Sequence, residues 1–200
     1  MLDTHVRPLI DPPLNAVGRR LARAGVTANQ VTLAGLVAGV MAAVAVAFGA
    51  FTLAIVLILL NRIADGLDGA VARASQQTDS GGFIDIVADY VFYASVPVAF
   101  AIVDPAANAV AAAALLASFC LTCSSFLAFA ILAAKRGIET EDHGKKSFFY
   151  STSLIEGTET IAFFLVMALL PAWFAPLAWM LCVLCLASAW QRTLLALKTF

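Results

Sequence analysis

The sequence predicts an all-α integral membrane protein that forms one domain. Of its 200 residues, 62% are hydrophobic and 12% are charged, whereas a soluble domain is about half apolar and a quarter charged. Several apolar segments reach the roughly 20 residues that a helix needs to cross a bilayer. The net charge of −1 provides no excess of basic residues of the kind that nucleic-acid binding requires.

Residues 1–28 form the most polar segment, and they precede a membrane domain that we place at residues 29–200. Asp11-Pro12-Pro13 can start a helix, because aspartate caps helices and proline suits their first turn. Apolar residues then recur at helical spacing, with arginines on the other side: Ile10, Leu14, Val17 and Leu21 against Arg19, Arg20 and Arg23. This pattern predicts an amphipathic helix at the membrane interface, and a cytosolic arm is the alternative.

Six apolar segments follow, and we expect each to cross the membrane once as a helix. The predicted helices cover residues 31–50, 51–74, 82–103, 107–134, 152–170 and 177–197. Short turns join them at one end of the bundle, and longer polar loops join them at the other. An even number of spans places both termini at the end with the polar loops.

Charge placement supports this topology. All 12 lysines and arginines fall at the end of the predicted bundle that holds the termini and the polar loops. Basic residues are enriched in the cytoplasmic loops of membrane proteins. We therefore expect both termini to face the cytoplasm, in a bacterial inner membrane.

The four cysteines form two CxxC pairs, Cys120/Cys123 and Cys182/Cys185. This spacing can indicate a zinc site or redox chemistry. Both pairs lie inside long apolar runs, where thiolate ligands would have to be desolvated. We therefore interpret these cysteines as small packing residues.

Four of the five aspartates between residues 61 and 93 form two pairs, in a largely apolar region. Asp65 and Asp68 are spaced i,i+3, whereas Asp85 and Asp89 are spaced i,i+4, so each pair lies on one helix face. Four carboxylates this close need cations, and oxygen ligands suit Mg²⁺, Mn²⁺ or Ca²⁺. Two such ions could bridge substrate phosphates. The alternative is an ion path lined by carboxylates.

Gly69, Gly82 and Arg73 lie between the aspartate pairs. Gly69 and Gly82 allow a ligand or a neighbouring backbone to approach closely. Arg73 provides a planar cation that suits phosphate. With the aspartates at a membrane surface, these residue types indicate a phosphorylated, membrane-bound substrate.

These residues follow one another as Asp65-x2-Asp68-Gly69-x2-Ala72-Arg73, then Gly82, Asp85 and Asp89. The arrangement resembles the signature of the CDP-alcohol phosphotransferase family of integral-membrane phospholipid synthases. The resemblance extends to the chain length, the six helices and the N-terminal amphipathic helix. Asn29 and Thr32 also match a Pro-Asn-x-x-Thr sequence that is common in the family, although Ala28 replaces its proline.

The resemblance implies a role for each of these residues. It implies that Asp65, Asp68 and Asp85 bind two divalent ions, Mg²⁺ or Mn²⁺, and that Asp89 is also at the metal site. It further implies that Asp89 is the general base. The residues implied to contact the CDP moiety are Gly69, Ala72, Arg73, Gly82, Asn29 and Thr32.

The implied reaction transfers a phosphatidyl group from CDP-diacylglycerol, or a similar CDP-alcohol, to the hydroxyl group of a small alcohol. The acceptor hydroxyl attacks the phosphorus attached to the lipid, and CMP leaves. The resemblance also implies a homodimer.

The acceptor is less clearly indicated. Family members that use an alcohol phosphate often carry arginines on helices four and five, whereas the corresponding positions here hold Ala128, Ala130, Gly157 and Thr160. Glu156 and Glu159 add negative charge, which disfavours the binding of an anionic acceptor. We therefore expect a neutral or amino-bearing acceptor, such as serine or a polyol.

Other interpretations of the acceptor region remain open. An alcohol phosphate such as glycerol 3-phosphate is the alternative acceptor, because Lys135 and Lys145 could reach the site from the polar loop. The two glutamates could instead be interfacial residues stabilised by the helix dipole.

Two other classes of protein use similar carboxylates. Membrane prenyltransferases resemble this chain in their aspartate-rich Mg²⁺ sites, but they carry two such motifs on a longer bundle. An ion channel or transporter would not explain Gly69, Ala72 and Arg73, nor the placement of the cluster at one end.

Overall fold

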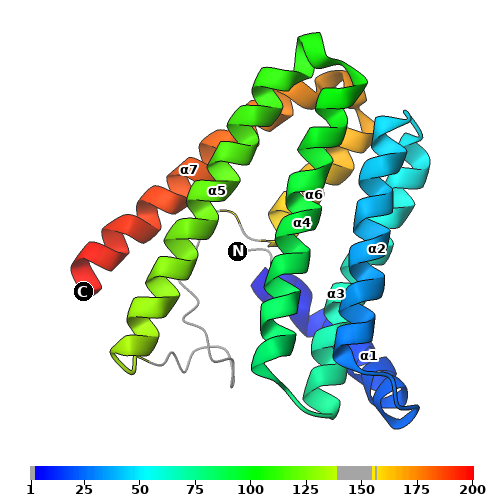
Figure 1. Cartoon of the computed structure of the whole chain (residues 1–200), viewed down its shortest axis with the longest axis vertical. Helices are drawn as coiled ribbons and strands as arrows, with labels where there is room; N and C mark the ends of the chain where they lie inside the picture. Colours follow the sequence, from blue (N-terminus) through cyan, green and yellow to red (C-terminus); the bar gives the residue numbers. More distant parts are fainter. Residues whose placement is uncertain (1–2, 139–154, 156) are drawn as a thin grey trace.

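The computed structural model describes residues 3–138, 155 and 157–200, and this part of the chain is helical without a strand. Figure 1 shows its long helices running up and down, with turns at the two ends of the bundle. The elements are α1 (Asp3–Arg23), α2 (Ala28–Ala47), α3 (Phe51–Ala74), α4 (Asp79–Val103), α5 (Pro105–Lys135), α6 (Gly157–Leu169), the 3₁₀ turn η1 (Pro171–Trp173) and α7 (Phe174–Thr199).

Four of the described helices are long and apolar enough to cross a membrane, by length and composition. They are Ala28–Ala47, Asp79–Val103, Pro105–Lys135 and Pro171–Thr199. The six predicted spans are therefore confirmed only in part. The region of α3 before Gly69 carries Arg62, Asp65 and Asp68, which lower its hydropathy. The 13 residues of α6 extend about 20 Å, less than the roughly 30 Å of a hydrocarbon core.

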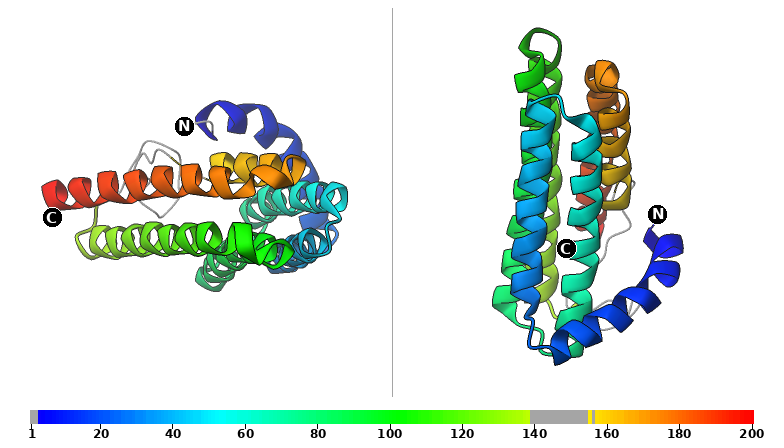
Figure 2. Two further views of the ribbon diagram at one scale, coloured as in Figure 1. Left: turned by 90° about the horizontal axis from the view of Figure 1, so that it is seen from above. Right: turned by 90° about the vertical axis from the view of Figure 1, so that its right-hand side faces the viewer.

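Helix α1 begins at Asp3, eight positions before the predicted start at Asp11. Pro12 and Pro13 therefore lie inside the helix, where a proline ring removes a backbone donor and bends the axis. Figure 2 shows α1 curving across the end of the bundle. The predicted interfacial placement of this helix stays a prediction, although Ile10 and Val17 are exposed on it.

Helix α1 packs closely against α3. A Cβ added at Gly18 would lie 2.7 Å from the Cβ of Ala70, and one added at Gly66 would lie 2.7 Å from Cδ1 of Leu14. Only glycine fits at either position without a shift of its neighbours. Gly66 and Ala70 lie in the same turns of α3 as Asp65, Asp68 and Gly69. The contact with α1 therefore packs against the segment of α3 that carries the acidic residues.

Helices α2 and α3 form a tight antiparallel pair. Thr27 and Gln30 cap α2 reciprocally, with Gln30 N donating to Thr27 Oγ1 over 3.3 Å and Thr27 N to Gln30 Oε1 over 3.0 Å. Gly49, with φ of +71°, forms the turn between the helices. The buried Asn61 side chain donates from Nδ2 to Gly35 O over 2.8 Å, which fixes the register of α3 against α2.

Aromatic residues connect α4 to α6 and α7. Phe100 stacks on Phe174 with 4.4 Å between ring centroids, and Phe92 meets Phe164 edge-on at 5.8 Å. All four rings are fully buried. Cys182 and Cys185 belong to the same core, in agreement with their interpretation as packing residues, whereas Cys120 is exposed.

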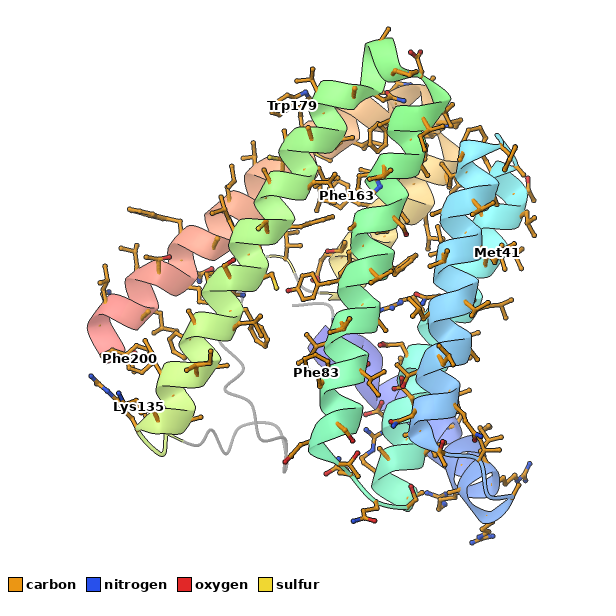
Figure 3. The ribbon with its side chains drawn as sticks, viewed as in Figure 1. Met41, Phe83, Lys135, Phe163, Trp179 and Phe200 are labelled. Atoms are coloured by element: carbon orange, nitrogen blue, oxygen red, sulfur yellow. The ribbon has the colours of Figure 1, made fainter. Side chains whose placement is uncertain are left out.

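The outer surface of the bundle is apolar. Met41 on α2, Phe83 on α4 and Trp179 on α7, labelled in Figure 3, are 48%, 69% and 48% exposed. Exposed large apolar side chains on every long helix suit a lipid environment. Helices α5 and α7 run side by side in Figure 2, and they form the wall of the bundle opposite α2 and α3.

Candidate active site

Helices α3 and α4 bring three of the predicted metal ligands together. Asp65, Asp68 and Asp85 each offer a carboxylate oxygen within 4.8 Å of the others. Thr78 caps α4 by accepting from Gly81 N at 3.1 Å, which places Asp85 in the second turn of the helix. Three converging carboxylates fit a divalent cation with oxygen ligands.

Asp68 is the most buried of these acids, with 6% of its surface exposed. Thr32 Oγ1 donates a hydrogen bond of 2.7 Å to Asp68 Oδ2. Thr32, expected at the CDP site, therefore also orients a carboxylate of the cluster. Residues behind a metal ligand commonly tune its affinity.

Asp89 lies apart from the three-aspartate group and pairs with Arg62. Arg62 Nη2 is 2.8 Å from Asp89 Oδ1, and Arg62 Nη1 is 3.5 Å from Asp65 Oδ2. Sequence reasoning missed this pair, because it used Arg62 only as a topology marker. The i,i+3 spacing from Arg62 to Asp65 was the available signal.

A cavity of about 1010 Å³ opens beside the aspartates. Most of the predicted donor-site residues line it: Asn29, Thr32, Asp68, Gly69, Ala72, Arg73, Gly82, Asp85 and Asp89. Asp65 is not among its lining residues. The volume is at the upper end of the range for small-molecule sites, so the cavity can hold a nucleotide together with part of a lipid.

Of the two adjacent glycines at the start of α4, Gly81 is the one that its neighbours constrain. Sequence reasoning named only Gly82. A Cβ added at Gly81 would lie 3.0 Å from Thr78 Oγ1 and 3.1 Å from Asn29 Oδ1, whereas one added at Gly82 would meet nothing within 4 Å. Gly81 also stands four positions before Asp85, the same step that separates Asp85 from Asp89. Both glycines line the cavity.

The Arg73 side chain is oriented by a hydrogen bond to α1 and lies over Gly69. Its Nη2 donates to Asn15 Oδ1 of α1 over 2.9 Å, so the N-terminal helix orients the predicted phosphate-binding arginine. A Cβ at Gly69 would lie 3.3 Å from Arg73 Nη1, so Gly69 leaves space for this side chain.

The opposite wall of the cavity contains a second buried arginine. Arg192 of α7 is 6% exposed and lines the cavity. Its Nη1 donates to Thr122 O over 3.0 Å and to Ser125 Oγ over 2.9 Å, and its guanidinium carbon lies 5.5 Å from the centre of the Phe126 ring. Sequence reasoning sought cations on the preceding two helices and counted Arg192 only for topology.

Of the expected acceptor residues, the two that the structure describes, Glu159 and Lys135, are not brought together. Glu159 lies in the first turn of α6, and Lys135 lies at the end of α5 near Phe200, far from α3 (Figure 3). Neither lines the cavity. Glu156 and Lys145 lie outside the described residues. Their roles in acceptor binding stay predictions.

A family model, CDP-alcohol phosphatidyltransferase, matches residues 25–195. The chain therefore belongs to the CDP-alcohol phosphatidyltransferase family, and it is a membrane-bound transferase of phospholipid biosynthesis.

Two curated relatives differ in how much of the chain they match. Inner membrane protein YnjF of Escherichia coli (strain K12) is 48% identical over 192 residues, which are 96% of this chain and 93% of that protein. Archaetidylinositol phosphate synthase of Pyrococcus horikoshii is 33% identical over 94 residues, 46% of this chain and 50% of that protein.

Solved structures share the fold. The Mycobacterium tuberculosis phosphatidylinositol phosphate synthase PgsA1 with CDP-DAG bound has a TM-score of 0.69 at 22% identity, covering 92% of each chain. The same enzyme with manganese and citrate has a TM-score of 0.70 at 21% identity, covering 93% of this chain and 89% of that one.

Proposed function

We propose that the protein transfers a phosphatidyl group from CDP-diacylglycerol, or a similar CDP-alcohol, to the hydroxyl group of a small alcohol and releases CMP. One observation carries the proposal: three carboxylates converge, and two of them, Asp68 and Asp85, line a large cavity together with Arg73 and Asp89. A solved relative of the same fold has CDP-DAG bound, which supports a CDP-linked lipid as donor.

The donor half of the site combines metal-binding and phosphate-binding groups. Asp65, Asp68 and Asp85, with Asp89, would hold two divalent ions, Mg²⁺ or Mn²⁺. When bound, such ions neutralise the pyrophosphate and stabilise charge on the departing CMP. Arg73 binds a phosphate oxygen through its fork of donors, and the CDP moiety lies against Asn29, Gly69, Ala72 and the two glycines at the start of α4.

Asp89 is the proposed general base. In the transfer step the acceptor oxygen forms a bond to the lipid-linked phosphorus, and the bond from that phosphorus to the CMP oxygen breaks. The Asp89 carboxylate takes the hydroxyl proton. Asp89 lies on α4 and lines the cavity, so an acceptor bound there could reach its carboxylate.

Two acceptor classes fit different observations. The absence of arginine at the aligned positions of α5 and α6 favours a neutral or amino-bearing alcohol. Arg192 on α7 supports the second candidate, an alcohol phosphate, because a buried guanidinium lining a cavity suits phosphate. Two similar proteins are named as synthases of inositol phosphate lipids, archaetidylinositol phosphate synthase and phosphatidylinositol phosphate synthase, which also supports this candidate.

A CMP-release assay tests the proposal. The purified chain is given CDP-diacylglycerol and Mg²⁺ or Mn²⁺, with serine, a polyol, glycerol 3-phosphate and inositol phosphate in separate reactions. We expect CMP release that requires both donor and metal, with one acceptor class giving a new lipid detected by mass. A failure of every acceptor to elicit CMP release would favour an ion pathway, and prenyl transfer from a prenyl pyrophosphate would favour a prenyltransferase.

We also propose that α3 and α6 complete six spans, that α1 lies at the interface, and that the site faces the cytoplasm of a bacterial inner membrane. The inner membrane location in the name of the E. coli relative supports this placement. Reporter fusions at Gly49 and Gln77 should report periplasm and cytoplasm respectively. Cross-linking in membranes should yield the homodimer that the family resemblance implies.

A further inference from the structure

We propose that Asn15 of α1 is a positioning residue for donor binding, and that it holds the Arg73 guanidinium at the cavity. The inference rests on the proposed function, in which Arg73 binds a phosphate of the CDP-lipid. Asn15 lies before residues 25–195, the part of the chain that the family model matches. The donor site therefore extends onto a helix that the family signature does not include.

Arg73 receives little support from its own helix. It lies in the last turn of α3 and is exposed, where a long side chain can adopt many rotamers. Carbonyl oxygens at a helix C-terminus attract arginine side chains, but Val71 O already accepts from Ser75 N over 3.0 Å and from Ser75 Oγ over 2.9 Å. An acceptor on another element is needed to hold the guanidinium in one place.

Asn15 provides this acceptor. Arg73 Nη2 donates to Asn15 Oδ1 over 2.9 Å, and a Cβ added at Gly69 would lie 3.3 Å from Arg73 Nη1. The guanidinium therefore lies over the preceding turn of α3, between Asn15 and Gly69. Because Gly69, Ala72 and Arg73 all line the cavity, a phosphate bound there can accept from the remaining N–H groups of the fork.

The position of Asn15 is fixed by the packing of α1 on α3. Three residues recur at i, i+4 and i+7 on the face of α3 that meets α1: Gly66, Ala70 and Arg73. Leu14 contacts the first of these and Gly18 the second, and neither contact has room for an added Cβ. Asn15 lies beside Leu14 and one turn before Gly18, so the two contacts set its distance from Arg73. Packing of this kind holds a binding group in one geometry.

Equilibrium binding of a fluorescent CDP-diacylglycerol tests this without turnover. The full chain in detergent is titrated with Mg²⁺ present and no acceptor, as wild type, Asn15→Leu, Asn15→Asp, Arg73→Gln and the Asn15→Leu/Arg73→Gln double variant. Leucine shares the branched shape of asparagine but has no acceptor oxygen. Asn15→Leu should therefore raise the Kd by about three- to tenfold, the range for loss of one hydrogen bond. Asn15→Asp keeps an oxygen that can accept from Nη2, so it should bind the lipid more tightly than Asn15→Leu.

The double variant shows whether Asn15 acts through Arg73. In the Arg73→Gln background, Asn15→Leu should raise the Kd by less than about twofold further. An equal effect of Asn15→Leu in both backgrounds would overturn the proposal, because Asn15 would then act through the packing of α1. A Kd for Asn15→Asp as high as that for Asn15→Leu would also overturn it. Arg20→Leu places the same side chain at an exposed position of α1 and is the control, which should leave the Kd unchanged.

Thermal unfolding and kinetics provide further readouts. Asn15→Leu should raise the KM for the CDP-lipid in proportion to its Kd, with kcat within about twofold, because loss of uniform binding changes KM alone. Gly18→Ala, which forces α1 away from Ala70, should lower the unfolding temperature as well as donor affinity, whereas Asn15→Leu should lower only donor affinity. A matching fall in the unfolding temperature of Asn15→Leu would assign Asn15 to the fold and overturn the positioning role.

The binding series also separates this inference from the proposed function. If wild type binds no CDP-diacylglycerol, the proposed function fails and the role of Asn15 fails with it. If wild type binds the lipid and Asn15→Leu binds it equally well, the proposed function stands and the role of Asn15 alone is overturned.

Discussion

The two walls of the cavity differ in how their charged groups are brought together. The donor wall takes its aspartates and Arg73 from α3 and α4, which are consecutive and joined by a short connection. The opposite wall places Arg192 of α7 against Thr122 and Ser125 of α5, positions that are 70 and 67 residues away in the sequence. The first wall is local in sequence, whereas the second depends on long-range packing.

We relate the donor wall to the transfer chemistry and the opposite wall to the choice of acceptor. Under the proposed function, the donor wall binds the CDP-lipid and the metal ions, whereas the opposite wall faces the acceptor. Changes in the donor wall should therefore lower turnover with any acceptor. Changes in the opposite wall should affect one acceptor class more than another.

The largest effect is expected for Asp89→Asn. Loss of the general base should lower kcat by about 10²–10⁴-fold with every acceptor, while CDP-lipid binding stays within a few-fold of wild type. Turnover and equilibrium binding of a labelled CDP-lipid measure the two effects. Asp104→Asn is the control, because it changes an exposed aspartate at the opposite end of the bundle that can still cap α5. Turnover near wild type in Asp89→Asn would remove the base assignment.

Thr32→Val should have the next largest effect. The Thr32 hydroxyl donates to the buried Asp68 carboxylate over 2.7 Å, and its loss should weaken Mn²⁺ binding by about 10–100-fold. Turnover at subsaturating metal should fall with every acceptor. Thr193→Val removes a hydroxyl that bonds within its own helix to Ala189 O, so it should change neither quantity. Unchanged Mn²⁺ affinity in Thr32→Val would show that Asp68 needs no support from α2.

The donor wall is also the part of the site that the sequence predicts well. The spacings of Asp65, Asp68 and Asp85 place them on helix faces, and one short turn between two helices brings those faces together. The partner of Asp89 could not be predicted in this way, because it depends on the rotation of α3 against α4. Arg192 could not be predicted because its place depends on the packing of α7 against α5.

Helix ends were predicted less well, and the choice between two adjacent glycines depends on neighbouring elements. The prolines at positions 12 and 13 favour a helix start, yet α1 begins at Asp3 and passes through them with a bend. Gly81 and Gly82 are equivalent by composition, and the positions of Thr78 and Asn29 distinguish them. The start of α1 and the constrained glycine are both set by contacts with neighbouring elements, which the local sequence does not specify.

Arg192→Gln tests the role of the opposite wall. If the acceptor is an alcohol phosphate, this change should raise its KM by about 10–100-fold, because a charged hydrogen bond contributes about 1.5–3 kcal/mol, with donor KM unchanged. With a neutral acceptor the KM should stay within about threefold. Lys198→Gln removes a charge from the exposed end of α7 and serves as the control. An equal loss with all acceptors would mean that Arg192 supports the fold or the donor instead.

The smallest effects are expected for alanine substitutions at two adjacent glycines of the donor wall, Gly81 and Gly82. Gly81→Ala brings a methyl group to about 3 Å from Thr78 Oγ1 and Asn29 Oδ1, so these two side chains must move by a few tenths of an ångström. We expect the KM for the CDP-lipid to rise by up to about tenfold, since small misplacements at a binding site are costly. Gly82→Ala meets no atom and should raise thermal stability slightly, because alanine stabilises a helix by about 0.5–1 kcal/mol relative to glycine. If Gly82→Ala instead weakens donor binding while stability rises, the space above Gly82 belongs to the nucleotide, and the close approach that the family signature requires occurs there rather than at Gly81.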